Sequence, residues 1–411
     1  MRNFKRWRLV STVAVAAVAA TVTFTASARA EGLKWSGQLR FRSEGFDRTL
    51  QSKPTQWDHL QRIRIGLTVP VADRIQAFVQ LQDARVWGAE RTTASDLHFV
   101  DLHQGYADLT DDCAQGTMRL RVGRQELSYG DERIVGALGW SNVGRSFDGV
   151  QARWSRGRYT GDMVAARLAD GSEISGQNDD LFLTYHRVTN TAGDRGLEAY
   201  AMYRASPGIA FETLLGERHF GSRGRIRIEE EFAYQFGRRA GVDLRAFLFT
   251  GQVYVNVAPQ WTLGGACDVL SGDDPGDEEL QAFDTRRIFQ TGHKFYGLMD
   301  IAENLAGNAG LIDPWAVILG PGMRGGSSRL EAHFFQVANS DVPQGFDIAH
   351  APLGVGQGAL GTEIDVISTL PVRAQTALEA GLALFMPGSR LESAGQPDNG
   401  YWGYLQGIVN F

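Results

Sequence analysis

The sequence has very little cysteine and, beyond its first thirty residues, no long apolar run. Its 411 residues include only Cys113 and Cys267, which are too few for a fold held together by disulfide bonds. Past Glu31 no apolar stretch reaches the roughly 20 residues that a helix needs to cross a bilayer. The eight histidines show no metal-ligand spacing, and no zinc, phosphate-loop or nucleophilic-serine motif occurs. We therefore expect neither a disulfide scaffold, nor a helical membrane protein, nor a resident cofactor.

The first thirty residues have the pattern of a secretory signal peptide. Basic residues between Arg2 and Arg8 precede an apolar run, 9–24, and Ala28-Arg29-Ala30 follows as a small-residue cleavage pattern. Cleavage after Ala30 predicts one mature domain, residues 31–411. Residues 1–30 hold five basic and no acidic residues, so the formal net charge of −6 becomes −11 in the mature chain. A chain this acidic is not expected to bind nucleic acid.

The mature chain is organised as short segments in which apolar and polar residues alternate, as in 62–69 and 118–122. Such alternation is typical of strands with one apolar and one polar face. Short connections alternate with long ones, notably 128–146 and 271–309, which is the pattern of outer-membrane barrels. We count eighteen strands, with starts near Leu33, Leu60, Arg74, Val100, Thr117, Phe147, Tyr159, Asp180, Gly196, Phe211, Gly224, Val242, Gln260, Gly310, Arg329, Gly358, Ala374 and Tyr401.

The last eleven residues, 401–411, form one of these segments and end in an aromatic residue. Leu405, Val409 and Phe411 share one face, and Gln406 lies on the other. A final strand that ends in phenylalanine resembles the closing strand of bacterial outer-membrane barrels, where this residue marks the chain for insertion. We predict that it pairs with the first strand, because an open edge in lipid would leave backbone groups without partners. The expected fold class is all-β, an antiparallel transmembrane β-barrel of 18 strands in the bacterial outer membrane.

The segment 123–150 carries the most specific motifs. It contains Gly-Arg-Gln-Glu-Leu at 123–127, Tyr-Gly-Asp-Glu-Arg at 129–133 and Trp-Ser-Asn-Val-Gly-Arg-Ser-Phe-Asp-Gly at 140–149. In this order the three blocks resemble the signature of the alginate export porin family. The resemblance implies an eighteen-stranded outer-membrane barrel through which polymers or small organic solutes pass passively. It also implies an arginine-rich constriction with acidic partners, outer-membrane lipid around the wall, and the barrel-insertion machinery as a partner.

Charged side chains recur on the polar face, which in such a barrel lines a wet interior. Arginine suits carboxylates because its planar fork donates two parallel hydrogen bonds and stays charged. The alternative is that these charges only brace the wall as salt bridges. Arg124 and Asp148 fall on the lipid-facing parity, so a bulge or loop begins there or the register is shifted by one. We predict that the substrate path or constriction comprises Arg40, Arg42, Arg62, Arg64, Arg119, Arg121, Arg124, Arg145, Arg153, Glu363 and Asp365.

Three functions agree with these patterns. The first is a passive channel for an anionic polysaccharide or a small organic solute, with alginate itself disfavoured by the acidic mature chain. The second is an outer-membrane barrel enzyme, for which Ser128 or Ser146 with His103 is the only candidate group. The third is a soluble secreted protein that binds glycans. The direction of the loop 128–146, inward or outward, is left open.

An acidic run, 273–279, lies in one of the long loops. Clustered carboxylates suit Ca²⁺, so this run is a candidate calcium site. The alternative is an ordinary solvated loop tip.

Overall fold

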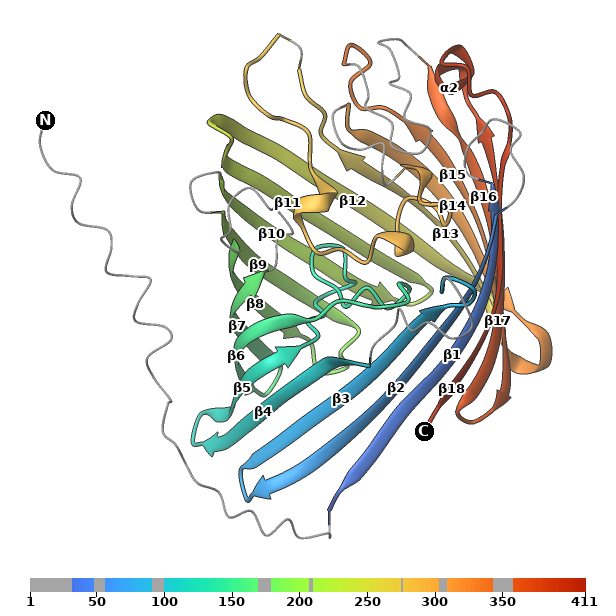
Figure 1. Ribbon diagram of the computed structural model, residues 1–411. Coiled ribbons are helices and arrows are strands. Elements are labelled where there is room, and N and C mark those ends of the chain that lie inside the picture. The colour runs from blue at the N-terminus through green and yellow to red at the C-terminus, as the bar shows by residue number, and fades with distance from the viewer. Residues whose placement is uncertain are drawn as a thin grey trace, which may run out of the picture.

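The alternation of apolar and polar residues produces long strands that close into an antiparallel barrel (Figure 1). The computed structural model describes residues 32–47, 56–90, 100–168, 179–206, 210–274, 276–302, 309–342 and 358–411; the expected signal peptide, 1–30, lies outside them. The strands are β1 (Lys34–Asp47), β2 (Gln56–Ala72), β3 (Ile75–Val86), β4 (Asp101–Cys113), β5 (Gly116–Gln125), β6 (Phe147–Arg156), β7 (Tyr159–Leu168), β8 (Asp179–Thr189), β9 (Arg195–Ser206), β10 (Ala210–Arg223), β11 (Ile226–Arg239), β12 (Val242–Ala258), β13 (Trp261–Leu270), β14 (Leu311–Pro321), β15 (Ser327–Gln336), β16 (Ala359–Arg373), β17 (Thr376–Pro387) and β18 (Gly400–Asn410).

The predicted strand pattern is confirmed: all eighteen predicted starts fall within four residues of a strand start. The largest difference is at β2, which begins at Gln56 and not near Leu60. The extra residues pair with the end of β1, and His59 hydrogen-bonds Ser43 across the two strands at 2.9 Å. β2 thus extends beyond the segment in which apolar and polar residues alternate, because β1 also pairs with its first residues.

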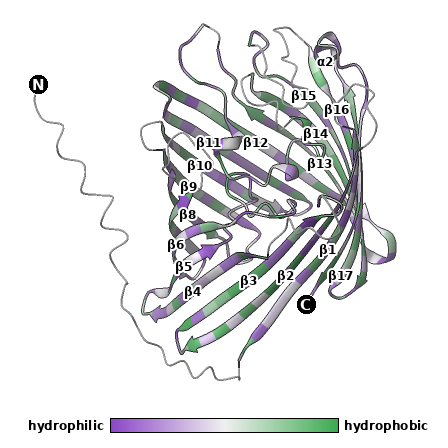
Figure 2. Cartoon of the chain, in the orientation of Figure 1, coloured by the Kyte–Doolittle hydropathy of each residue, from purple (hydrophilic) through white to green (hydrophobic). Residues whose placement is uncertain are grey.

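The outer face of the wall is apolar because every second side chain points away from the interior. In β12, for example, Phe247, Phe249 and Val253 are exposed, whereas the intervening Leu248 and Thr250 are buried. Figure 2 shows the resulting alternation of hydrophobic and hydrophilic residues along the strands. Among the described residues, no helix is both long and apolar enough to cross a membrane.

The last strand closes the barrel against the first, as predicted. β1 and β18 pair from Gln38 opposite Asn410 to Asp47 opposite Tyr401. Beyond the strand, Gly37 and Phe411 exchange backbone hydrogen bonds of 2.8 and 3.0 Å. The ring of Phe411 lies over Gly37, where an added Cβ would come within 2.2 Å of a ring carbon. The closing strand is therefore held at its end by an aromatic ring that only glycine accommodates.

Two long connections fold into the barrel, and we call them the β5–β6 loop (126–146) and the β13–β14 loop (271–310, described except for 275 and 303–308). Figure 1 shows the β5–β6 loop and the helical turns of the β13–β14 loop inside the ring of strands, whereas the first part of the β13–β14 loop extends beyond the strand ends. They pair with each other through backbone hydrogen bonds of 2.8 Å, from Gly136 to Phe289 and from Phe289 to Ile134. The inward course of the β5–β6 loop resolves the alternative that the sequence leaves open.

In its described residues, the second of these loops contains short helical turns and no added strand. The turns are η1 (Thr285–Arg287) and η2 (Gly292–Lys294). The segment 293–301 is thus part of the loop, as the even strand count requires. Outside the loops lie η3 (Met323–Gly325), in the β14–β15 turn, and α2 (Ser389–Ser393), between β17 and β18.

Candidate functional site

Four predicted arginines of β1 and β2, Arg40, Arg42, Arg62 and Arg64, hold the β5–β6 loop against the wall, and we call them the anchor arginines. Arg40 donates to the carbonyl oxygens of Gly139 at 2.8 Å and Ser141 at 2.9 Å. Arg62 donates to the same two carbonyls, at 3.2 and 2.9 Å. Both side chains are almost fully buried.

The other two anchor arginines contact the loop at Trp140 and at its first residue, Glu126. Arg42 donates to the carbonyl of Trp140 at 2.8 Å, and its guanidinium lies 3.7 Å from the centre of the Trp140 indole ring. Arg42 also forms an ion pair with Glu44. Arg64 forms an ion pair of 3.0 Å with Glu126, the first residue of the loop. Donors of both side chains thus bind the loop, and others bind residues of the wall, namely Glu44 and Gln82.

Glu126 connects the anchor arginines to β4. Its Oε1 lies 2.7 Å from Nε2 of His103 and 3.0 Å from Nη1 of Arg64. Burial by itself would raise the pKa of Glu126, but the hydrogen bond from His103 and the charge of Arg64 outweigh it and lower the pKa below its usual value. The carboxylate is therefore held ionised where the loop leaves the strand.

Of the two serines in the enzyme hypothesis, only Ser146 lies near His103. Ser146 Oγ lies 3.4 Å from Nδ1 of His103, but its hydroxyl donates to the His103 carbonyl oxygen at 2.6 Å. Ser128 lies elsewhere and donates to Glu132 at 2.6 Å. The serine hydroxyl near the histidine is thus engaged in tying the end of the loop to β4.

Arg133 is buried between the two inward loops and is not among the predicted site residues. Its guanidinium lies 3.3 Å from Asp268, 3.8 Å from Glu231 and 4.1 Å from the centre of the Phe295 ring. Burial disfavours the charge, but Asp268 and the neighbouring acids more than offset it and raise the pKa of Arg133. The Tyr-Gly-Asp-Glu-Arg block signals this residue, although alternation cannot place it because it lies outside a strand.

Arg145 joins the two inward loops to each other. It donates to the carbonyl oxygens of Gly136 at 3.1 Å and Gln290 at 3.2 Å, and also to that of Phe289. It is therefore a contact between loops, inside the barrel but not on its wall.

Three further predicted arginines, Arg119, Arg121 and Arg153, lie together on the inner face of β5 and β6, and we call them the path arginines. Arg121 makes two hydrogen bonds to Asp108, of 2.7 and 2.8 Å, and Arg153 makes two to Asp162, of 2.8 and 3.0 Å. They are all only partly buried.

Arg119 differs from its two neighbours in having no acidic partner. It stands directly opposite Arg153 across the two strands. Its Nη2 donates to Gln151 at 2.7 Å, and in the described part of the chain it forms no ion pair. The path arginines thus combine three positive charges with two aspartates.

Arg124 does not line the interior, which corrects its place in the predicted constriction. Arg124 pairs in register with Asp148, and their side chains form an ion pair of 3.2 Å with exposed fractions of 39 and 61 %. No bulge interrupts β5 before Arg124, so the two-residue period keeps it on the same face as the exposed Val122.

Glu363 and Asp365 lie on the inner face of β16, beneath the β13–β14 loop. Glu363 accepts a hydrogen bond of 2.8 Å from the backbone nitrogen of Met299. Both carboxylates are almost completely buried. Beside them, a cavity of about 220 Å³ opens between this loop and the wall, lined in part by Arg227, Arg329 and Lys294.

The acidic run of the β13–β14 loop uses several of its carboxylates to shape the loop itself. Asp273 accepts hydrogen bonds from the backbone nitrogens of Gln281 at 2.7 Å and Ala282 at 2.8 Å. Glu279 forms an ion pair with Arg245 at 3.1 Å. Residue 275 lies outside the described residues, and calcium binding by this run stays a prediction.

Comparison with known proteins identifies the family. A family model described as alginate export matches residues 32–305, which is more than half of the chain. The chain belongs to the alginate export family. No protein in a collection of curated sequences matches it.

Solved structures of porins share the fold. The chain is similar to OccK8 (OprE) of Pseudomonas aeruginosa, with a TM-score of 0.63, 12 % identity, and coverage of 93 % of this chain and 98 % of the porin. It is also similar to OccK2 (OpdF) of the same organism, solved in complex with glucuronate, with a TM-score of 0.63, 10 % identity and coverage of 92 and 96 %. A BenF-like porin from Pseudomonas fluorescens Pf-5 gives a TM-score of 0.63, 10 % identity and coverage of 93 and 99 %.

Family and fold together make this protein a channel of the bacterial outer membrane. The hypothesis of a soluble secreted protein is therefore wrong. The alginate export and porin families consist of channels and not of enzymes. Insertion by the barrel-insertion machinery stays a prediction.

Proposed function

We propose that this channel passes small carboxylated solutes and that the path arginines form its selectivity site. The observation that carries the proposal is the direct opposition of Arg119 and Arg153 on the inner face. Like charges directly opposite each other destabilise a sheet, and Asp162 forms its ion pair with Arg153 and not with Arg119. A carboxylate between the two guanidinium groups would accept hydrogen bonds from both and remove the repulsion.

Small solutes are favoured over a polymer because two loops occupy the interior of the barrel. The β5–β6 loop is fastened to the wall by the anchor arginines and to the β13–β14 loop by Arg145. The porin OccK2 was crystallised with glucuronate, a carboxylated sugar of the proposed class. An anionic polysaccharide is the second candidate, and the family description favours it.

Planar-bilayer recording with Arg119→Gln combined with Arg153→Gln tests the selectivity site. We expect the reversal potential in a KCl gradient to shift toward cation selectivity, and the current block by added glucuronate to weaken at least several-fold. Arg124→Gln is the matched control, because it removes the same charge from the outer face. An unchanged reversal potential in the double variant would contradict the proposal. Release of an anionic polysaccharide from loaded proteoliposomes would favour the polymer.

We further propose that Ser146, His103 and Glu126 serve as a loop attachment and have no catalytic role. The support is the hydroxyl of Ser146, which donates to a carbonyl oxygen, and the carboxylate of Glu126, which is shared with Arg64. We expect a fluorophosphonate probe to leave Ser146 unmodified in the folded protein, as judged by mass spectrometry. Specific labelling of Ser146 that Ser146→Ala abolishes would show an activated nucleophile.

A further inference from the structure

A single histidine on the inner wall is surrounded by buried carboxylates. His333 and Glu331 belong to β15, Asp313 to β14 and Asp365 to β16, and we call these four residues the His333 cluster. Each of the four side chains is more than nine-tenths buried. Buried charges of one sign are costly unless they are paired or bind a metal.

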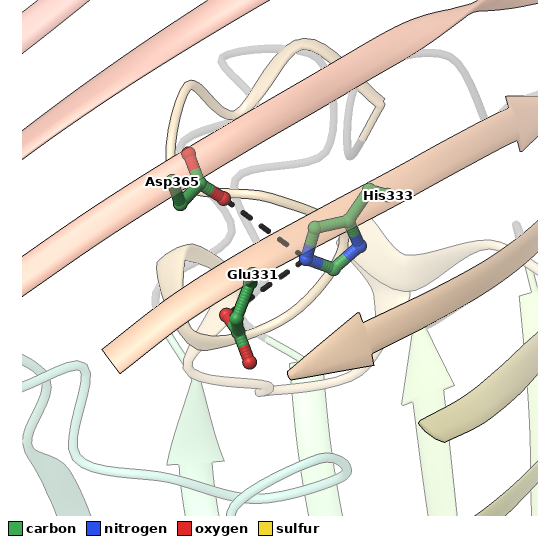
Figure 3. Close-up of side chains that lie close together, drawn as sticks. All are labelled: Glu331, His333 and Asp365. Carbon is green, nitrogen blue, oxygen red and sulfur yellow. Dashed lines mark ion pairs between the residues drawn. The ribbon is translucent and has the colours of Figure 1, made fainter. Parts of the chain in front are cut away.

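The side chains converge on one nitrogen of the ring, as Figure 3 shows. Nε2 of His333 lies 3.9 Å from Oε2 of Glu331 and 4.0 Å from Oδ2 of Asp365. These separations are too long for hydrogen bonds. Nε2 of His333 and both carboxylate oxygens of Asp365 are buried without a hydrogen-bond partner. Three donor atoms therefore face one point from two adjacent strands.

The histidine ring is fixed in the orientation that this arrangement needs. Its Nδ1 lies 2.8 Å from Oδ2 of Asp313, and its ring stacks between Trp315 and Phe335 with centroid separations of 5.8 and 5.4 Å. A carboxylate on the far nitrogen of a histidine commonly orients metal-binding histidines and fixes the tautomer. When Nδ1 donates to Asp313, the neutral ring presents its Nε2 lone pair toward Glu331 and Asp365.

We propose that Glu331, His333 and Asp365 bind a divalent first-row transition metal ion, with Asp313 as the residue that orients His333. Ligands about 2.1 Å from a shared tetrahedral ion lie about 3.4 Å apart. The three donor atoms lie within 4.8 Å of one another, so they would draw closer together around a bound ion. One imidazole nitrogen with two carboxylates suits zinc or manganese better than calcium, which prefers oxygen ligands alone.

The surrounding charges support a cation at this point. Arg329 forms an ion pair with Oε1 of Glu331, which leaves Oε2 toward the histidine. Asp365 has no arginine or lysine within ion-pair distance in the described part of the chain. Glu363 lies on the same strand face, two residues from Asp365, and adds a further buried acid. A divalent ion would balance carboxylates that the arginines leave uncompensated.

The cluster is also accessible from the interior. Glu331 and His333 line the cavity of about 220 Å³ next to the inward loops. An ion bound there would join β15 to β16 beside the channel. The proposal does not depend on the identity of the transported solute, because none of the path arginines belongs to the cluster.

Metal binding to the untagged full-length protein in detergent tests the proposal, after treatment with a chelator and dialysis. We expect Zn²⁺ or Mn²⁺ to bind with one equivalent per chain in isothermal titration calorimetry, and Co²⁺ to give a visible absorption band. His333→Gln and Asp365→Asn should each weaken this binding at least a hundredfold. Asp313→Asn should weaken it about 10- to 100-fold, as expected for a residue that orients a ligand.

The matched control is His219→Gln, since His219 also lies between two glutamates, Glu217 and Glu230, but is exposed on β10. This variant should keep the full stoichiometry. Heat-modifiable mobility in electrophoresis shows that each variant is folded. Failure of the folded wild-type protein to bind any of the three ions would overturn the proposal, and so would undiminished binding by His333→Gln.

Discussion

The anchor arginines and the path arginines begin from the same arrangement and end in different surroundings. Each group has an Arg-x-Arg pair on the inner face of a strand, and each places two arginines directly opposite each other, Arg40 with Arg62 and Arg119 with Arg153. In the first group the repulsion is relieved by carbonyl oxygens of the β5–β6 loop. In the second, aspartates relieve it only in part.

The difference shows that an arginine on the inner face of the barrel is not by itself a selectivity site. Carbonyl oxygens of Gly139 and Ser141 accept hydrogen bonds from Arg40 and Arg62, and almost none of the surface of these two arginines is exposed. The path arginines remain partly exposed, and within the described residues Arg119 forms no ion pair. An arginine acts on a solute only where the protein leaves its charge uncompensated.

The largest effect is expected when the β5–β6 loop is released from the anchor arginines. Arg40→Ala combined with Arg62→Ala removes several charged hydrogen bonds to the loop, each worth about 1.5–3 kcal/mol. We expect the β5–β6 loop to leave the interior and the single-channel conductance to rise several-fold. Cleavage by trypsin after Arg133 or Arg145 should accelerate. The double variant of Arg119 and Arg153 is the control, because it should change selectivity at nearly unchanged conductance.

If the conductance of the Arg40 and Arg62 variant equals that of the wild type, the loop does not depend on these contacts. The distinction between anchor and path arginines would then have to be abandoned. A loss of folding, detected by electrophoretic mobility, is separated from loop release by the single variants Arg40→Ala and Arg62→Ala.

A smaller effect is expected from pH, through Glu126. The pKa of this residue is lowered in the folded protein from an ordinary value of 4.5, so its contribution to stability is present above pH 4.5 and is lost as pH falls through the lower folded value. Below pH 4.5 we expect the end of the loop to loosen and the current noise to increase. Glu126→Gln should show this behaviour already at pH 7 and with less dependence on pH. Identical pH profiles for the two proteins would remove Glu126 from the anchor.

Much of the fold could be predicted because a barrel wall is a local pattern. A strand that separates lipid from a wet interior must alternate, so the residues around Arg62 and Arg119 reveal their faces without knowledge of any partner. The end of β18 is predictable for the same reason. The predicted start of β2, near Leu60, is later than the observed start at Gln56, because His59 joins the strand through its contact with Ser43. Such a contact has no signal in the local sequence.

The site could be predicted only as a set of inward charges. Periodicity does not predict Arg133, because it lies in a loop, and the parity of Arg124 indicates the outer face, as the structure shows. The His333 cluster has a signal, the alternate spacing of Glu331 and His333 and of Glu363 and Asp365, but two residues on each of two strands become one group only when β15 and β16 pair.

By itself, the sequence determined the barrel, its eighteen strands and the closure of β18 on β1, because each depends on a two-residue period and on the need to satisfy every backbone group in lipid. The tertiary structure alone decided which arginines hold a loop and which stay partly exposed on the inner wall. The reason is physical: a guanidinium binds both backbone carbonyls and carboxylates, and only the fold decides which of them lies within hydrogen-bond distance. Here the inward course of the β5–β6 loop brings backbone carbonyl oxygens to Arg40 and Arg62.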